Sequence, residues 1–430
     1  MTVRREVEYL FGRINSLRRS AGLRLGCVAS SLGGRGLIAV HVGETTIEID
    51  TDGPDMGHRL SYTLSREELP RDGGETACQL QIHPDDTGRG ELPLHVVFCV
   101  DSSYSMRGGD IEAAKQGVES AVEHLSSDDQ FGVVEFDDDA SIVANPVAGN
   151  RYGRVRSSVE GIEADGNTNI MDGLEKSRQL LDKMRGGGGF LSSGSTDAVE
   201  WILLISDGQP NRTNESAFKR ALDGLTTTKA EKHGAAAGDL SDQGITVHTA
   251  GVGSGYDPAV NEAISDASGG TMEHKNSGRG IGDFFEGQIR DARSVVATNP
   301  TLTLRPANGA SVDNVMQELP TKIKDPNVER RGGELVVDVP DLNVDDPPQF
   351  SFDIDVPSEA NPVAHAELDV DGDTATAAIE VGFASAALVK DEVNEDVLEN
   401  RDAITRYEDR KDSMSAEQRA QEKSSGITRE

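Results

Sequence analysis

The stretch Val97-Phe-Cys-Val-Asp-Ser-Ser-Tyr-Ser-Met106 joins a hydrophobic run to a group of oxygen-bearing side chains. The mostly apolar run from Leu92 to Val100 lies between polar segments, which is typical of a strand buried on both faces of a parallel sheet. It ends at Asp101, and a helix is expected to begin near Gly109. The pattern predicts a central strand with a functional loop at its carboxyl end, because open α/β sheets bind ligands at that edge.

Three oxygen donors follow this strand in alternation, the carboxylate of Asp101 and the hydroxyls of Ser103 and Ser105. Oxygen ligands suit a hard divalent cation, so the loop is a candidate site for Mg2+ or Mn2+ in preference to Ca2+. Aspartate and serine are also common turn and helix-capping residues, and capping alone explains many such patterns. The choice between a metal site and a capped turn depends on the rest of the chain.

Two later stretches supply further oxygen donors at the ends of predicted elements. Asp165-Gly-Asn-Thr-Asn-Ile-Met-Asp-Gly-Leu174 places Thr168 just before an amphipathic segment. Trp201-Ile-Leu-Leu-Ile-Ser-Asp-Gly-Gln-Pro210 is a second buried strand, which ends on Asp207 and is followed by a Gly/Pro turn. Together these stretches favour the metal site over simple capping.

The three stretches, in this order, resemble the von Willebrand factor type A domain and its metal-ion-dependent adhesion site. The family motif is Asp-x-Ser-x-Ser, then a threonine in a Gly/Asn-rich loop, then an aspartate that ends a hydrophobic strand. The residues that match it are Asp101, Ser103, Ser105, Thr168 and Asp207. The resemblance implies that the hydroxyls contact the metal and that the aspartates act directly or through water. It also implies an open coordination position, which an Asp or Glu side chain of a partner protein fills.

The residues themselves favour the same function, a divalent-metal-dependent protein–protein interaction module that acts as an adaptor or scaffold. Two carboxylates balance the charge of a dication and the hydroxyls add none, so the ion can attract a further anionic ligand. No His or Cys belongs to the three loops that carry these oxygen ligands, so neither a catalytic residue nor an organic cofactor site is predicted. Two alternatives stay open. One is a subunit of a Mg2+-dependent enzyme complex, which would need a base such as His124 or His274, and the other is a purely structural metal.

The charge of the chain is strongly acidic. It has 430 residues, with 75 Asp and Glu against 42 Lys and Arg, and a formal net charge of −33. A hydrophobic content of 36% with clear strand runs argues against simple disorder. An acidic coat on a folded protein predicts a halophilic, archaeal source, because high salt screens the self-repulsion. The same charge argues against nucleic-acid binding.

Cysteine usage and the N-terminal segment bear on the cellular compartment. Cys27, Cys78 and Cys99 form no close pair and no metal-binding spacing, so we interpret them as small apolar residues in a reducing compartment. The chain opens with charged residues, and no run approaches the ~18 apolar residues that a membrane span requires. The sequence therefore predicts a cytoplasmic protein without a membrane span, and it does not indicate the oligomeric state.

The α/β region is expected to be inserted in a second domain. Strand and helix alternate through it, which is typical of a doubly wound, mostly parallel sheet flanked by helices. Alternating strands precede and follow it, and each group alone offers a sheet face that must be covered, so together they predict an antiparallel β-sandwich. Bacterial and archaeal members of the family with flanking sandwich strands are similar. The predicted boundaries are 1–26 for an amphipathic basic helix, 37–91 for the first sandwich strands, 92–296 for the von Willebrand factor type A domain, 297–385 for the rest of the sandwich and 386–430 for a charged helical or disordered tail.

Three local predictions concern segments outside the candidate site. The Ala/Gly-containing segment 235–242 is expected to be a solvated loop. Asp369-Val-Asp-Gly-Asp373 has calcium-loop character, but alternating apolar residues flank it and its glycine is misplaced, so a hairpin turn at Asp371-Gly372 is favoured. In the charged tail, weak helical spacing predicts a solvated helix that frays into disorder.

Overall fold

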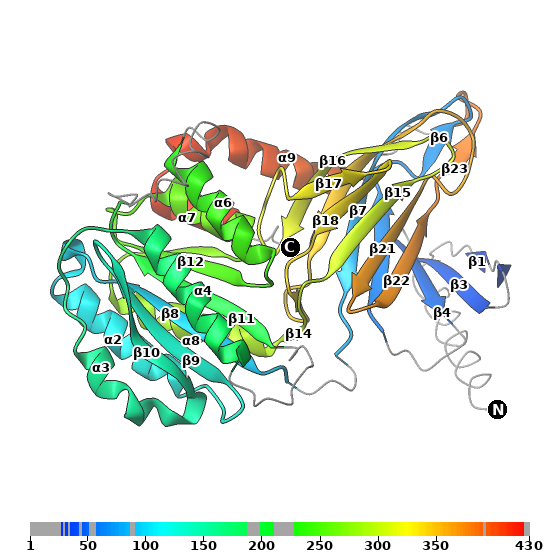
Figure 1. Cartoon of the computed structure of the whole chain (residues 1–430). Helices are drawn as coiled ribbons and strands as arrows, with labels where there is room; N and C mark the ends of the chain where they lie inside the picture. The colour runs from blue at the N-terminus through cyan, green and yellow to red at the C-terminus, as the bar shows by residue number, and fades with distance from the viewer. Residues whose placement is uncertain are drawn as a thin grey trace, which may run out of the picture.

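A computed structural model describes residues 57–86, 91–186, 198–209, 228–389 and 393–424. It also gives the strand backbones of β1 (Cys27–Val28), β2 (Ser31–Leu32), β3 (Arg35–Val42) and β4 (Thr45–Asp50). The basic helix predicted over 1–26 lies outside the described residues. Figure 1 shows an α/β domain beside a β-sandwich, with the last helices of the chain above their junction.

A six-stranded sheet forms the centre of the α/β domain, in the order β10-β9-β8-β11-β12-β13. Five of its strands run parallel, and β10 pairs antiparallel with β9 at one edge. The two central strands, β8 and β11, are buried at every residue, which explains their continuous hydrophobic runs. The strands are β8 (Leu94–Asp101), β9 (Gln130–Phe136), β10 (Ala140–Ala148), β11 (Val199–Ser206), β12 (Thr246–Val252) and β13 (Met272–Lys275).

Helices cover both faces of this sheet, as Figure 1 shows. One core contains Phe98 and the apolar faces of α2, α3 and α8; the other contains Cys99 and those of α4, α6 and α7. Alternate residues of β8 thus enter opposite cores, as a doubly wound sheet requires. The helices are α2 (Gly109–Val122), α3 (Arg156–Glu160), α4 (Ile170–Gly186), α6 (Lys229–Ser241), α7 (Pro258–Ala267) and α8 (Arg279–Arg293), with short 3-10 turns η1 (Tyr104–Met106) and η2 (Gly149–Arg154).

The loop predicted over 235–242 is wrong, because most of this segment belongs to α6. Its small residues suggested flexibility, but they belong to a helix that packs closely on α7. A Cβ at Gly234 would lie 3.2 Å from the backbone oxygen of Ala263 on α7. A capping box formed by Thr228 and Glu231 also fixes the start of the helix.

Strands from both sides of the α/β domain build the sandwich. β7 (Gly74–His83) pairs antiparallel with β20 (Gln349–Val356) along its length, so the first and last parts of the chain share one sheet. This confirms the predicted insertion of the α/β domain in an antiparallel sandwich. One sheet continues with β5 (Arg59–Leu64), β16 (Ser311–Leu319) and β1 to β4, and the facing sheet contains β15 (Thr301–Pro306), β17 (Val328–Arg331), β18 (Glu334–Asp338), β21 (Ala364–Val370) and β22 (Asp373–Ile379). Two small pairs join β6 (Glu68–Pro70) to β23 (Gly382–Ala384) and β14 (Val295–Ala297) to β19 (Leu342–Asn343).

The hairpin predicted at Asp371-Gly372 joins β21 to β22. Both residues have positive φ values, 54° and 90°, which are the values that a tight hairpin turn needs. Val370 pairs with Asp373 across the turn, so the segment is a two-residue hairpin loop. The hairpin prediction is confirmed over the calcium-loop alternative.

The charged tail is not solvated as predicted. Helices α9 (Glu395–Arg410) and α10 (Ala416–Ser424), joined by η3 (Lys411–Ser413), pack against both domains. Val397, Ile404 and Tyr407 are buried, and Lys423 is only 1% exposed. The charged residues could be buried because Glu262 and Asp266 of α7 supply partners for them.

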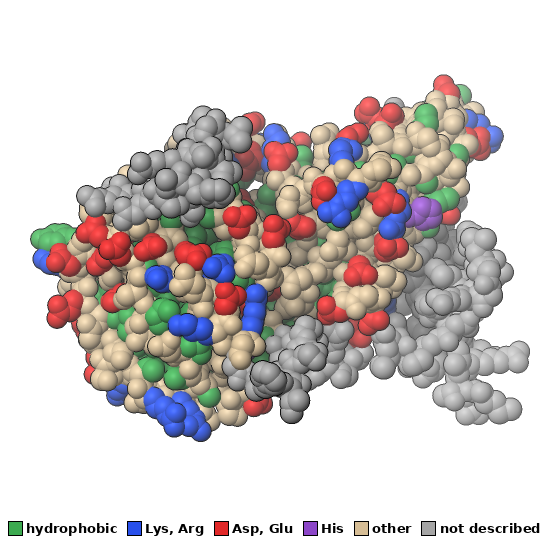
Figure 2. Space-filling view, viewed as in Figure 1, with side chains coloured by type: hydrophobic (Ala, Val, Ile, Leu, Met, Phe, Trp, Pro, Cys, Tyr) green, Lys and Arg blue, Asp and Glu red, His purple; other side chains and the backbone are tan. Residues whose placement is uncertain are grey.

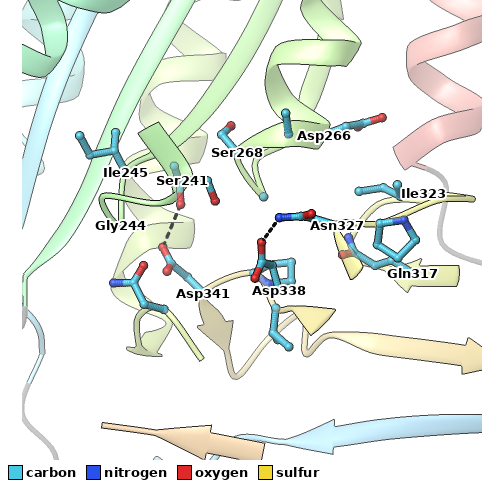
Figure 3. Close-up of a pocket in the computed structure, with 17 residues that line it drawn as sticks. Ser241, Gly244, Ile245, Asp266, Ser268, Gln317, Ile323, Asn327, Asp338 and Asp341 are labelled. Carbon is cyan, nitrogen blue, oxygen red and sulfur yellow. Dashed lines mark hydrogen bonds between the residues drawn. The ribbon is translucent and has the colours of Figure 1, made fainter. Parts of the chain in front are cut away.

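A small cavity lies where the two domains meet. Figure 3 shows Asp338 and Asp341 of the sandwich side facing Asp266 and Ser268 of the α/β domain across it. The Asp341 carboxylate accepts a hydrogen bond of 2.9 Å from the indole N–H of Trp201. Burial raises the pKa of Asp341, while this hydrogen bond acts in the opposite direction. The contact ties β11 of the α/β sheet to the sandwich.

Asp341→Ala is expected to lower the free energy of unfolding by about 1–3 kcal/mol, because the indole N–H loses its buried acceptor. Trp201 is the only tryptophan of the chain, so its fluorescence during guanidinium unfolding reports on this contact directly. Asp338→Ala is the matched control, because Asp338 lines the same cavity but is exposed. Equal destabilisation by the two substitutions would contradict the role given to Asp341.

Two further observations concern the whole described chain. Cys78 and Cys99 are buried and form no disulfide. None of the helices in the described ranges combines the length and apolar character needed to cross a bilayer.

Candidate metal centre

The candidate site lies at the carboxyl end of β8, the strand at which the direction of the sheet connections reverses. β8 pairs with β9 on one side and with β11 on the other, and both neighbours are parallel to it. Chain segments leaving such a strand diverge to opposite sides and open a crevice between them. Asp101 is the last residue of β8, so its side chain is placed in this crevice.

The three predicted loops converge there. Ser103 and Ser105 follow Asp101 in the loop before α2, Thr168 precedes α4, and Asp207 follows β11. Two backbone hydrogen bonds join the first two loops: Asp165 donates to the oxygen of Ser102 at 2.8 Å, and Tyr104 donates to that of Gly166 at 3.1 Å. These bonds position the hydroxyls of separate chain segments at one point.

A chain of hydrogen bonds links four of the five predicted residues. The Asp101 carboxylate accepts from the backbone N–H of Ser103 at 2.8 Å. The hydroxyls of Ser103 and Ser105 are 3.0 Å apart, and that of Ser105 donates to Asp207 at 2.6 Å. These bonds join the two aspartates and the two serines in one continuous cluster.

Thr168, the fifth residue, faces the same cluster from the loop before α4. It is 2% exposed, and Gly208 approaches its hydroxyl so closely that a Cβ at Gly208 would lie 2.4 Å from the threonine oxygen. The same Cβ would lie 3.4 Å from the hydroxyl oxygen of Ser105. Glycine at 208 therefore lets the loop after β11 close over both hydroxyls.

Asp101 is a buried carboxylate that accepts hydrogen bonds from neutral donors. It is 0% exposed and accepts from the Ser103 N–H and, at 2.5 Å, from the Ser206 hydroxyl. Burial raises the pKa of Asp101 to about 7, and the nearby charge of Asp207 adds to this effect. Burial also raises the pKa of Asp207, with Asp110 contributing. Both carboxylates would be stabilised in their charged form by a cation.

The donor set fits a hard dication. It offers two carboxylates and three hydroxyls from three loops, and no nitrogen or sulfur ligand. In the described ranges, no group of three or more His, Cys, Asp or Glu side chains is arranged to hold a metal, so the hydroxyls are essential to this candidate site.

Several supporting residues were not predicted from the sequence. The Ser206 hydroxyl donates to Asp101. The loop that carries Thr168 is held against Asp138: the Asn167 amide donates to the Asp138 carboxylate at 2.5 Å, and the Asn169 amide donates to its backbone oxygen at 3.1 Å. Ser206 was recognisable only by its place beside Asp207, while Asp138 lies in the turn between β9 and β10, which the sequence does not connect to the site.

The two histidines considered as bases lie elsewhere. His124 follows α2 at the end remote from the site and lies 3.9 Å from Glu286. The strand register places His274 beside Gly251, which in turn lies beside Ser206. His274 is thus two strands, roughly 10 Å, from the end of β11, and its ring contacts the Tyr256 hydroxyl at 3.1 Å.

Gly208→Ala is expected to weaken Mg2+ binding about 10- to 100-fold, a loss typical of disturbed support around metal ligands. The added methyl would displace the Thr168 hydroxyl, since the close contact cannot be accommodated. Gly109→Ala is the control, because a Cβ there meets nothing within 4 Å. Calorimetric titration with Mg2+ measures both affinities, and an unchanged affinity in Gly208→Ala would contradict the assigned geometry.

Comparison with known proteins agrees with the fold and the loops. A family model for the von Willebrand factor type A domain matches residues 96–209, which include all five candidate ligands. A solved von Willebrand factor type A protein from Catenulispora acidiphila is similar in fold, with a TM-score of 0.64 and 15% identity, over 84% of each chain.

Two curated relatives are similar in sequence. An uncharacterized protein of Synechocystis sp. is 28% identical over 296 residues, which are 66% of this chain and 63% of that protein. Human inter-alpha-trypsin inhibitor heavy chain H4 is 34% identical over 128 residues, 29% of this chain and 13% of its own length. The matched region therefore spans less than two thirds of either relative.

Proposed function

Because this chain contains a von Willebrand factor type A domain, we propose that it is a divalent-metal-dependent protein-binding module, which acts as an adaptor or scaffold. A carboxylate of a partner protein would complete the coordination of the bound Mg2+. Domains of this family typically mediate protein–protein interactions. The observation that carries the proposal is the cluster in which Asp101, Ser103, Ser105 and Asp207 are joined by hydrogen bonds, with Thr168 facing it.

With a dication bound, the five residues would form a site of about zero net charge. Asp101 and Asp207 balance a dication, and the three hydroxyls are neutral. When bound, Mg2+ would supply a Lewis-acidic centre that attracts an anionic oxygen ligand. Ser105 is exposed and Asp207 is half-buried, so a ligand from another chain can approach from that side, while Asp101 and Thr168 remain buried beneath it.

The arrangement supports binding in preference to catalysis. A hydrolytic use of the metal would need a general base within hydrogen-bond reach of the reacting group. The two histidines considered for this role are at the far end of α2 and two strands away from β11. The remaining polar groups at the cluster are hydroxyls and the two carboxylates that would be occupied by the metal.

The proposal is tested by affinity capture from a native lysate, with wild type and Asp101→Ala as baits, each in Mg2+ and in EDTA. A protein retained only by wild type in Mg2+ is the expected result. Ser102→Ala is the matched control, because Ser102 lies in the same loop but bonds to the Phe136 backbone at 3.2 Å and is outside the ligand set. Equal retention in all conditions would refute the metal-bridge mechanism.

A further inference from the structure

We propose that the rim of this site selects a protein segment whose metal-binding Asp or Glu is flanked by Lys or Arg, and that Tyr104 is the surface on which this segment packs. The inference rests on the proposed function and specifies the chemistry of the partner. It comes from two features of the rim: an exposed aromatic ring beside the metal ligands and an excess of carboxylates around them.

Tyr104 stands between the two serines of the site and points outward. It is 61% exposed, whereas Met106, two residues later, is fully buried. Among the described residues, the only other exposed large hydrophobic side chains are those of Leu388 and Leu398, in the last part of the chain. An exposed ring beside candidate ligands is typical of a contact residue, because aromatic side chains bury much area at low entropic cost.

The ring is held in place before any partner binds. The Arg107 guanidinium lies over it, 4.1 Å from the ring centroid. That guanidinium is itself fixed by hydrogen bonds to the Ala164 backbone oxygen at 2.8 Å and to Asp165 at 3.1 Å. The backbone N–H of Tyr104 is bonded to Gly166. Such preorganisation reduces the ordering cost of association.

The rim around the ring is acidic. Asp165 binds the Arg107 guanidinium, Asp110 lies in the first turn of α2, and Asp137 and Asp138 lie against Gly166. Asp139 completes the same turn through its N–H bond to Asp137. Arg107 lies among these carboxylates and is paired with Asp165. Figure 2 shows acidic side chains gathered at this end of the α/β domain, where a small hydrophobic patch also projects.

This charge distribution constrains the partner. A bound dication would offset Asp101 and Asp207, but the rim carboxylates would still repel an incoming acidic segment. Lys or Arg beside the metal-binding carboxylate would reverse this repulsion, and a cation can also pack on the Tyr104 ring. A second copy of this chain is a poor occupant, because two surfaces of a protein with net charge −33 would meet.

The test uses an array of immobilised peptides with a central Glu flanked on each side by Arg, Gln or Asp. Labelled full-length protein is applied in Mg2+ and in EDTA, and solution affinities are then measured for the same peptides. Arg-flanked peptides are expected to bind about tenfold or more tightly than Gln-flanked ones, and Asp-flanked ones most weakly. The preference should shrink at about 1 M salt, where the Debye length falls to ~3 Å.

Two variants separate the ring from the charge. Tyr104→Ala is expected to weaken binding of the Arg-flanked peptide about tenfold, with Mg2+ affinity unchanged. Asp137→Lys should shift the preference toward Gln- and Asp-flanked peptides. Mg2+ titration of each variant shows whether the metal site is intact.

The outcomes distinguish this inference from the function on which it rests. Absence of Mg2+-dependent binding to every peptide would overturn the proposed function, and this inference with it. Mg2+-dependent binding that is equal for all flanking residues would overturn only the charge selection. Unchanged affinity in Tyr104→Ala would overturn the role of the ring.

Discussion

Asp101→Ala is expected to abolish the stabilisation that Mg2+ gives to this protein. Wild type should gain about 2.7 kcal/mol in the free energy of unfolding at a Mg2+ concentration of 100 times Kd, because the ion binds only the folded chain. The variant should gain nothing, since it lacks the buried carboxylate at the base of the oxygen cluster. Thermal unfolding with increasing Mg2+ measures the difference.

The metal-free proteins should differ much less. Replacing Asp101 removes a charge whose burial raises its pKa to about 7, which relieves a cost of folding. It also leaves the Ser206 hydroxyl and the Ser103 N–H without their acceptor, which lowers the free energy of unfolding by about 1–3 kcal/mol and offsets that gain. Ser102→Ala should keep the full response to Mg2+. A Mg2+ response of Asp101→Ala equal to that of wild type would exclude Asp101 as a ligand.

Thermal unfolding and partner capture together test whether the metal is purely structural. If EDTA lowers the unfolding temperature of wild type but leaves partner capture unchanged, the ion closes the loops without bridging to another chain. If both are lost together in wild type, and neither responds to Mg2+ in Asp101→Ala, the bridge remains the better account.

Local patterns predicted the centre of the fold because burial there is uniform. The runs that became β8 and β11 are apolar at nearly every position, and both strands are buried on both faces. The turn residues Asp371 and Gly372 specify their own backbone geometry, so the hairpin also followed from sequence. Asp101 and Asp207 lie at the ends of β8 and β11, and these parallel strands bring both aspartates to one edge of the sheet.

The features that sequence did not predict depend on partners far along the chain. Trp201 meets Asp341 across 140 positions, and Glu262 meets Lys423 across 161. Composition suggested a loop for α6 and a solvated tail for α10, because glycines and charges are usually exposed. In both cases tertiary packing against α7 reversed the expectation, and no periodic pattern marks such pairing in advance.

Glu262→Ala is expected to lower the free energy of unfolding by about 3–5 kcal/mol, because it leaves buried cations without a counter-charge. Glu262 is 2% exposed and accepts hydrogen bonds from the Tyr407 hydroxyl at 3.0 Å, from Lys423 at 3.2 Å and from Arg419. Lys423 and Arg419 are themselves 1% and 5% exposed. Hydrogen exchange should accelerate throughout α9 and α10, whose attachment to α7 depends on this residue.

Glu422→Ala is the matched control, since it removes an acidic partner of these C-terminal helices from an exposed position on α10. Its pair with Arg410 is exposed on both sides, and such pairs contribute about 0.2–1 kcal/mol. Similar destabilisation by the two substitutions would show that the Glu262 cluster does not hold the helices in place.

Acid should reduce the difference between wild type and Glu262→Ala. Burial opposes ionisation of Glu262, but Lys423, Arg419 and Lys411 outweigh it and hold its pKa below the ordinary 4.5. A depressed carboxyl pKa contributes stability that is complete above the unfolded value and is lost as the pH falls through the folded one. The part of the gap in unfolding free energy that comes from the Glu262 charge should therefore narrow as the pH falls below about 4.5, as unfolding curves at a series of pH values would show. A gap that stays constant below that pH would mean that Glu262 stabilises the junction by packing, with its charge contributing little.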